Sequence, residues 1–202
     1  GDRPMCILVG PPGAGKTTRV PLALLDAAWL GDRAIVMLEP RRVAARAAAQ
    51  YMARGLGEQP GDSVGYRVRL DTRVGPATRI EVVTEGILTR MLEEDPALER
   101  YGAVIFDEFH ERSLHADLGL ALALESQQVL RPDLRILVMS ATLDSAGVAA
   151  LLDDCPVVSS AGRSYPIEIR HAARPPSFRC TAPSPPPTRT VPSAPTRGAA
   201  AR

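Results

Sequence analysis

Lysine, cysteine and long apolar runs are all scarce in this chain of 202 residues. The three cysteines, Cys6, Cys155 and Cys180, have no paired spacing. This pattern argues against a disulfide framework or a zinc site and favours a reducing cytosol. No stretch of about 18 apolar residues is free of charge, so the sequence predicts no membrane span. We therefore expect a cytoplasmic protein that makes no contact with a membrane.

Charge of one sign does not dominate the chain either. The formal net charge is +1, so any contact with nucleic acid must be local. The length suits one domain, or one domain with an appendage, and 45% hydrophobic residues are enough for a core. Residues 171–202 hold eight prolines and five arginines but no acidic residue. Such a segment buries too little apolar surface to order itself, so we expect a disordered, low-complexity tail there.

What the chain does have is a phosphate-loop pattern, Gly10-Pro-Pro-Gly-Ala-Gly-Lys-Thr17. Apolar residues predict a buried strand at 5–9 before it and a helix at 18–29 after it. Glycines let backbone N–H groups curl round a phosphate, and the helix N-terminus adds partial positive charge. Lys16, the only lysine among 24 basic residues, would then reach the β- and γ-phosphates, and the Thr17 hydroxyl would hold Mg²⁺. The alternative is a glycine-rich turn that binds nothing.

Apolar runs and turn residues predict strands and helices in alternation along the rest of the chain. Predicted strands lie at 34–38, 64–70, 79–83, 103–106, 135–139 and 157–158. Predicted helices lie at 43–54, 87–92, 114–130 and 146–152, and Leu114, Leu118 and Leu122 stack on one face of the third. This alternation predicts an α/β fold, a mostly parallel sheet with helices on both faces.

Two acids, Asp107 and Glu108, directly follow the buried strand predicted at 103–106. A carboxylate at this place can bind Mg²⁺, and a second can orient and deprotonate the attacking water. We therefore expect Asp107 to act on the metal and Glu108 on the nucleophile. The alternative is a pair of solvated acids at a strand end.

The segment Asp107-Glu-Phe-His110 resembles motif II of DEAH-type superfamily 2 helicases. Pro40-Arg-Arg42, Thr84-Glu-Gly86 and Ser140-Ala-Thr142 resemble motifs Ia, Ib and III of the same family. Longer runs are similar to the HrpB branch of bacterial ATP-dependent helicases, among them LEPRRVAARAAAQ, RIEVVTEGILTRML and VIFDEFHERSLHADLGLALALE. The resemblance covers roughly residues 5–170, with the motifs in the family's order.

The resemblance implies a RecA-like domain over residues 1–170 that uses ATP and Mg²⁺. It implies a nucleotide-binding set of Gly10, Gly13, Ala14, Gly15, Lys16, Thr17 and Thr18. It implies metal ligands at Thr17, Asp107 and Glu108, and catalytic roles for Lys16, Asp107, Glu108 and His110. In related helicases an arginine near the end of the helix after motif Ia stacks on adenine, and Tyr51 stands at that place.

Further implied roles concern coupling and nucleic acid. His110 is expected to couple the nucleotide to a second motor domain, and Ser140 and Thr142 to relay its state. The alternatives are an ordinary hydrogen-bonded histidine and simple turn hydrogen bonds. A single strand, RNA rather than DNA, is expected to meet a set of residues that contact its phosphates: Arg41, Arg42, Thr84, Arg67 and Arg69. For Arg67 and Arg69 a solvated strand face is the alternative.

The chain departs from the family after Arg170, where motifs IV to VI and their arginine fingers are missing. Such a finger contributes about 10³–10⁵ in rate, so we expect ATP–Mg²⁺ binding with slow hydrolysis by this chain alone. The proline- and arginine-rich tail suggests a frameshift, with a genuine linker as the alternative. A truncated ATP- or nucleic-acid-binding fragment without helicase activity is the second functional reading. A small-molecule P-loop kinase is disfavoured because motifs Ia, Ib and III have no task there.

Overall fold

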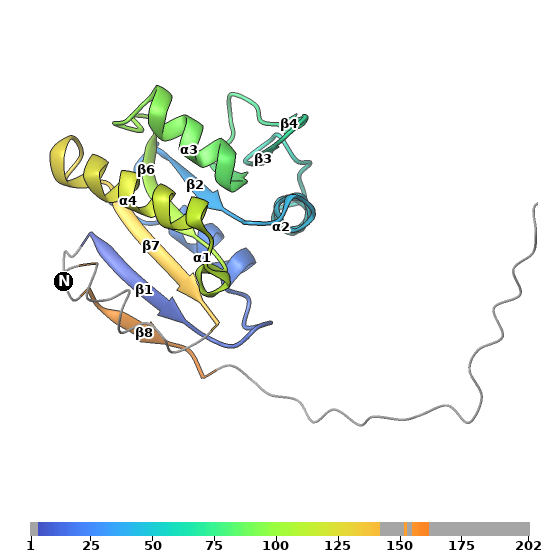
Figure 1. The fold of residues 1–202 in the computed structure, drawn as a ribbon. Coiled ribbons are helices and arrows are strands. Elements are labelled where there is room, and N and C mark those ends of the chain that lie inside the picture. Colours follow the sequence, from blue (N-terminus) through green and yellow to red (C-terminus); the bar gives the residue numbers. More distant parts are fainter. Residues whose placement is uncertain (1–3, 142–151, 153–154, 162–202) are drawn as a thin grey trace, which may run out of the picture. The chain divides into compact units, whose positions relative to one another are not determined.

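The computed structural model describes residues 4–141, 152 and 155–161, which build an eight-stranded sheet flanked by helices (Figure 1). The strands are β1 Met5–Val9, β2 Ala34–Leu38, β3 Val64–Val68, β4 Asp71–Arg73, β5 Ile80–Val83, β6 Tyr101–Phe106, β7 Arg135–Ser140 and β8 Val157–Ser159. Their order is β4-β3-β5-β2-β6-β7-β1-β8, and every neighbouring pair is parallel except β3–β4. The predicted mostly parallel sheet is confirmed.

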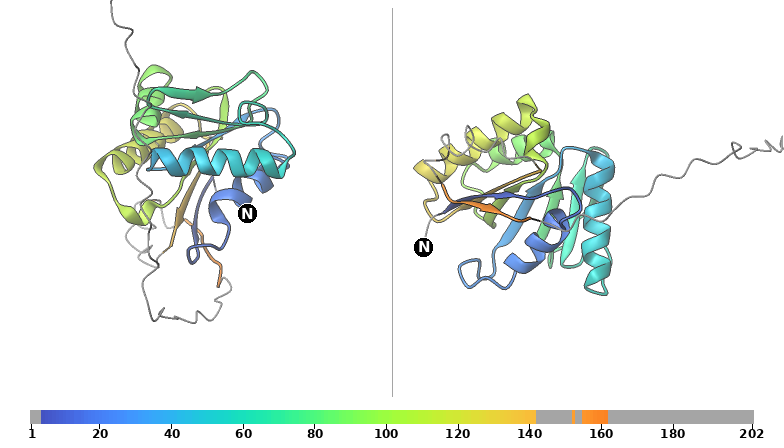
Figure 2. Two further views of the ribbon diagram at one scale, coloured as in Figure 1. Left: turned by 90° about the vertical axis from the view of Figure 1, so that its right-hand side faces the viewer. Right: turned by 90° about the horizontal axis from the view of Figure 1, so that it is seen from below.

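Helices cover both faces of this sheet, as predicted. They are α1 Lys16–Leu24, α2 Arg42–Gly55, α3 Glu85–Glu94 and α4 Leu114–Val129, and a 3-10 turn, η1, covers Phe109–Glu111. Figure 2 shows α1 and α2 on one face and α3 and α4 on the other. In the part of the chain that the structure describes, no helix combines the length and the apolarity needed to cross a membrane.

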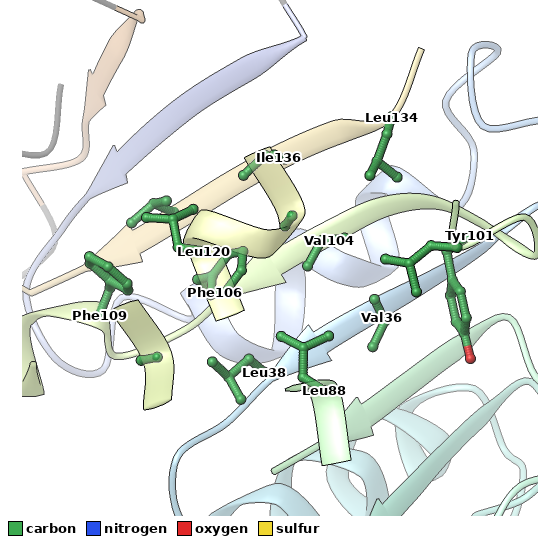
Figure 3. Close-up of a cluster of buried hydrophobic side chains, with 14 of the residues drawn as sticks. Val36, Leu38, Leu88, Tyr101, Val104, Phe106, Phe109, Leu120, Leu134 and Ile136 are labelled. Atoms are coloured by element: carbon green, nitrogen blue, oxygen red, sulfur yellow. The ribbon is translucent and has the colours of Figure 1, made fainter. Parts of the chain in front are cut away.

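The two cores follow from the two-residue period of the central strands. Along β2, Val36 and Leu38 pack with the residues of α3 and α4, while Ile35 and Met37 pack with those of α2. Figure 3 shows Val36, Leu38 and the β6 residue Phe106 converging with side chains of the covering helices. Because both faces are buried, these strands are apolar throughout rather than alternating, which is why the sequence displayed them so clearly.

The parallel arrangement brings the carboxyl ends of β2, β6, β7 and β1 to one edge of the sheet, in that order. The loop Gly10–Gly15 leaves β1 there, and Asp107 leaves β6. Between them lies Ser140, the last residue of β7. Ligands of open α/β sheets bind at this edge, where loops leave the strands. The topology therefore collects the predicted site residues in one place.

The predicted strand at 64–70 was wrong at its end. β3 ends at Val68, and Leu70 lies in a tight turn with φ 66° and 93% of its surface exposed. The turn returns the chain as β4, which pairs antiparallel to β3, a hairpin that the sequence analysis missed. Leu70 fits the alternating pattern of the strand, but a positive φ outside the strand region ends it.

On α4 only one of the three stacked leucines packs against the core, because Leu114 and Leu118 are exposed and Leu122 is partly buried. The fully buried positions of this helix include Ala116, Leu120 and Ala123. Small residues on the buried face let this helix lie close to the strands. The predicted helix at 146–152, Thr142 and the tail at 171–202 lie outside the described residues, apart from position 152.

Candidate nucleotide-binding site

The loop between β1 and α1 has the backbone of a phosphate cradle. Gly13 and Gly15 have φ of 78° and 83°, values that residues with a Cβ rarely adopt. Gly15 caps α1 in the left-handed region, so the helix starts with Lys16 and its first N–H groups have no helical partners. These donors and the helix dipole create a binding place for an anion.

Lys16 is buried in this loop although it carries a charge. Its Nζ donates to the carbonyl oxygens of Gly10 and Pro11, at 2.6 and 3.2 Å. Both acceptors are neutral, so the ammonium retains its full charge for an anionic ligand. The side chain is held by backbone groups of the same loop, which places its charge beside the anion-binding N–H groups.

Asp107 lies at the end of β6 and is only 2% exposed. Its Oδ1 accepts from the Glu108 N–H at 2.9 Å, but its buried Oδ2 has no hydrogen-bond partner among the described residues. Burial raises the pKa of this carboxyl above its ordinary value, while the neighbouring Thr17 hydroxyl, the Glu108 N–H and Lys16 act in the opposite direction. A buried carboxylate oxygen without a partner is costly unless a ligand satisfies it.

The donor set around Asp107 fits Mg²⁺. The ion prefers oxygen ligands and binds through one or two carboxylates together with the phosphates of a substrate. Asp107 supplies the carboxylate, and Thr17 supplies a hydroxyl from the first turn of α1. Within the described ranges no group of three or more His, Cys, Asp or Glu forms a metal site by itself. A bound Mg²⁺ would therefore depend on nucleotide oxygens to complete its shell.

A cavity of about 530 Å³ lies between the start of α1, the helix α2 and the segments that follow β2 and β6. It is lined by residues of both motifs and of the helix: Thr17, Thr18, Glu39, Arg41, Ala44, Ala47, Ala48, Tyr51, Glu108 and Glu111. The small side chains of the alanines keep the cavity open, because larger side chains on this face of α2 would fill it. The structure thus brings Tyr51, predicted from its place in the family pattern, into one cavity with Thr17, Thr18 and Glu108.

Glu108 and His110 connect this cavity to the end of β7. Glu108 has φ 50°, a left-handed conformation at the start of η1, and its Oε2 lies 3.4 Å from His110 Nε2. His110 Nδ1 accepts from the Ala141 N–H at 3.2 Å. Since Nδ1 is the acceptor, Nε2 can carry the proton and face the Glu108 carboxylate. His110 therefore bridges the second acid and the segment that follows β7.

Ser140 is linked to the phosphate loop as well. Its carbonyl oxygen accepts from the Gly10 N–H at 3.1 Å. The phosphate loop, the Asp107–His110 motif and the predicted coupling residue Ser140 are thus connected by backbone hydrogen bonds and by one from a backbone N–H to His110. A shift of the loop on binding a phosphate would reach the end of β7 directly.

Glu39 is a site residue that the sequence analysis missed. It follows β2, lines the cavity and is 4% exposed. Burial, together with the charges of Asp107, Glu108 and Glu111, raises the pKa of its carboxyl to about 8, although a hydrogen bond from the Arg41 N–H acts in the opposite direction. The available signal was topological, because β2 and β6 are neighbours and Glu39 and Asp107 follow them at matching positions.

The predicted nucleic-acid residues separate into different environments. Arg41 and Thr84 follow β2 and β5, and Arg69 is exposed after β3, so three neighbouring strands place them along one edge. Arg67, by contrast, forms an ion pair at 2.7 Å with the fully buried Glu81, which also accepts from the Tyr101 hydroxyl. Its charge neutralises a buried acid inside the protein.

Comparisons with known proteins agree with this geometry. The family model described as DEAD/DEAH box helicase matches residues 2–151. The chain is 55% identical over 172 residues to the ATP-dependent RNA helicase HrpB of Escherichia coli K12, covering 85% of this chain and 21% of that protein. It is 36% identical over 170 residues to the pre-mRNA-splicing factor ATP-dependent RNA helicase prp22 of Schizosaccharomyces pombe, covering 84% of this chain and 14% of prp22.

Solved structures show the same likeness in three dimensions. A crystal structure of the Escherichia coli DEAH/RHA helicase HrpB superimposes with a TM-score of 0.78 at 56% sequence identity, covering 82% of this chain and 21% of that one. The chain therefore spans about a fifth of the length of HrpB and less of prp22.

Proposed function

The chain belongs to the DEAD/DEAH box helicase family, and on that premise we propose that it is the ATP-binding first motor domain of an ATP-dependent RNA helicase. One observation carries the proposal. The buried Asp107, whose Oδ2 has no partner in the described part of the chain, lies near Lys16 and Thr17, and Thr17 and the neighbouring Glu108 line a cavity of about 530 Å³. A phosphate with its magnesium ion fits both the unpaired carboxylate and the N–H groups of the loop.

Each residue of the site has a physical role in this proposal. The α1 N-terminus and Lys16 neutralise the phosphates of ATP. Asp107, Thr17 and Glu108 would hold Mg²⁺. The metal, when bound, stabilises negative charge that develops on the phosphate oxygens.

Glu108 would orient a water molecule and take its proton at the carboxylate. His110 limits the orientations of Glu108, because its Nε2 lies 3.4 Å from Oε2 and its Nδ1 is held by the Ala141 N–H. Ser140, and Thr142 beyond it, would relay the state of the site through this link. Tyr51, an exposed aromatic residue that lines the cavity, would stack on the base.

We propose single-stranded RNA as the second ligand, because the relatives are RNA helicases by name. Arg41, Arg42, Arg69 and Thr84 form the proposed contact set. Arg67 leaves that set, since its guanidinium is engaged with Glu81. Contacts of this kind go to the phosphate backbone, so they favour a single strand without reading its bases.

The remaining parts of the proposal rest on composition and family pattern. Residues 1–170 would form one RecA-like domain of a cytoplasmic protein, and 171–202 a low-complexity tail that is either a frameshift product or a linker. The chain spans about a fifth of HrpB. We therefore propose that the missing family motifs belong to a second RecA-like domain, and that this chain alone hydrolyses ATP weakly.

The test is nucleotide binding and turnover by the 202-residue chain, measured with RNA and DNA oligonucleotides in parallel. Calorimetry should detect Mg²⁺-dependent ATP binding that Lys16→Ala abolishes. RNA should stimulate the low turnover of the wild-type chain but not of Glu108→Gln. Binding without any turnover under either condition would instead favour the alternative of a non-catalytic fragment. Absence of ATP binding by folded protein would contradict the proposal.

A further inference from the structure

The two arginines that follow β2 are neighbours in sequence but have different partners. Arg41 Nη2 donates to Glu111 Oε1 at 2.6 Å. Arg42 Nη2 donates to the carbonyl oxygen of Arg69 at 3.0 Å. Glu111 ends η1, the turn that begins directly after Glu108. The Arg41–Glu111 ion pair thus joins the proposed RNA-binding edge to the turn behind the site acids.

This pair lies at a boundary between two cavities. The nucleotide cavity of about 530 Å³ adjoins a second cavity of about 210 Å³. The residues that line both are Arg41, Glu108 and Glu111. A change at this ion pair therefore alters the lining of both cavities.

The exposure of the two partners is unequal. The Arg41 side chain is 71% exposed, whereas that of Glu111 is 35% exposed. A phosphate from solvent can approach the arginine, while the glutamate stays beside the acids of the cavity. The charge of Glu111 already acts there, because it contributes to the raised pKa of Glu39.

We propose that Glu111 is a positioning residue that competes with an RNA phosphate for Arg41 and thereby links RNA binding to the charge of the nucleotide cavity. This inference rests on the proposed function. When a phosphate takes Arg41, Glu111 loses its cation and its charge adds to those of the nearby Asp107 and Glu108. A bound triphosphate then meets stronger repulsion, so RNA and the triphosphate lower each other's affinity. By linkage the effect is the same in both directions.

The size of the effect follows from the exposure of the pair. Ion pairs at a protein surface contribute up to about 1 kcal/mol, which corresponds to about fivefold in an equilibrium constant. A shift of this size is measurable by the fluorescence anisotropy of a short labelled oligouridylate. Glu111→Gln should therefore bind this RNA about two- to fivefold more tightly than the wild-type chain, because Arg41 is released from its partner.

A double-mutant cycle separates this mechanism from a general effect of charge. Arg41→Gln should weaken RNA binding and lower the slope of its salt dependence by about one. Adding Glu111→Gln to Arg41→Gln should not raise RNA affinity, because the arginine that Glu111 pairs with is already absent. A merely structural role of Glu111 would lower the melting temperature and would not raise RNA affinity at all.

A matched control removes the same charge elsewhere. Glu94 forms an ion pair at 2.7 Å with Arg90 on α3, and both side chains are exposed. Glu94→Gln should leave RNA affinity unchanged. The inference is overturned if Glu111→Gln gains nothing, if its gain persists with Arg41→Gln, or if Glu94→Gln matches it. A wild-type chain that binds no oligouridylate would also refute the RNA part of the proposed function, whereas binding without the Glu111 effect refutes this inference alone.

Discussion

Charged residues differ in their pairing between the two edges of the sheet, one where the parallel strands begin and one where they end. At the edge where the parallel strands begin, arginines and acids are matched with each other and with backbone carbonyls. At the edge where they end, Asp107 Oδ2 has no partner among the described residues and the pKa of Glu39 is raised to about 8. Since buried polar groups are normally satisfied, the second edge has the character of a binding site and the first that of a support.

Arg131 illustrates the supporting edge. Its guanidinium donates to both carboxylate oxygens of Asp133 and to the carbonyl oxygens of Ala97, Leu98 and Tyr101. The pKa of Asp133 is held below its ordinary value by Arg131 and Arg33. A guanidinium suits this task because its five donors can reach several acceptors at once, which a lysine cannot do. This difference gives a physical reason for a chain in which arginine replaces lysine outside the phosphate loop.

The largest expected effect tests the binding edge. Glu108→Gln removes the proposed proton acceptor but keeps the shape of the side chain. Turnover of ATP should fall by about 10²–10⁴-fold, the usual contribution of a general base. Binding of ATP–Mg²⁺ should persist, because Lys16 and Asp107 remain. Single-turnover kinetics and calorimetry measure the two quantities, and equal losses in both would contradict the division of roles.

The supporting edge is tested by Arg131→Ala. The substitution leaves three carbonyl groups without this donor and Asp133 with Arg33 as its remaining guanidinium partner, and each unsatisfied group costs about 1–3 kcal/mol when it stays buried. We expect the free energy of unfolding to fall by about 3 kcal/mol, measured by urea denaturation. Nucleotide affinity at low temperature should stay close to that of the wild type. A large loss of nucleotide affinity without a loss of stability would contradict the division into a binding edge and a supporting edge.

Glu39→Gln tests the strain at the binding edge through pH. The carboxyl of Glu39 has a pKa of about 8 in the folded chain against an ordinary value of 4.5. The folded state therefore holds a proton that the unfolded state has released, and stability is lost as pH rises from about 4.5 to about 8.

The amide that Glu39→Gln introduces cannot titrate, so the variant should lose less stability on raising the pH. Between about pH 6 and pH 9 the difference from wild type should grow by about 2–3 kcal/mol, at 1.36 kcal/mol for each unit below the pKa. Denaturation curves at both values measure it. Parallel pH profiles of the two proteins would show that Glu39 keeps an ordinary pKa.

The smallest effect is expected for Arg79→Gln, at the supporting edge. Arg79 donates to the carbonyl oxygens of Gly31 and Arg33, at 2.6 and 3.2 Å. Part of this contact is exposed, so water can replace the lost donor. The free energy of unfolding should fall by about 1 kcal/mol, a typical net value for such hydrogen bonds. A loss as large as that of Arg131→Ala would mean that this edge acts as one cooperative network.

Local patterns accounted for much of the fold and for the centre of the site. The strands at 5–9, 34–38 and 103–106 were recognisable because they are apolar on both faces, and the structure places them at β1, β2 and β6. The phosphate loop was recognisable because its glycines and lysine are consecutive. The hairpin after β3 escaped prediction because its turn depends on the backbone of Leu70, and Leu70 continues the apolar pattern of the strand.

Partners of charged residues, by contrast, came only from the structure. Arg41, Arg42 and Arg67 look alike in the sequence, yet one meets Glu111, one a carbonyl and one the buried Glu81.

By itself the sequence determined where most of the strands lie, where the phosphate loop lies and which two acids follow the central strand, because these depend on residues close together in the chain. The tertiary structure alone decided that Glu39 joins those acids and that Arg41 and Glu111, 70 positions apart, share a hydrogen bond. Such pairings depend on the order of the strands in the sheet, and that order is set by packing over the whole domain.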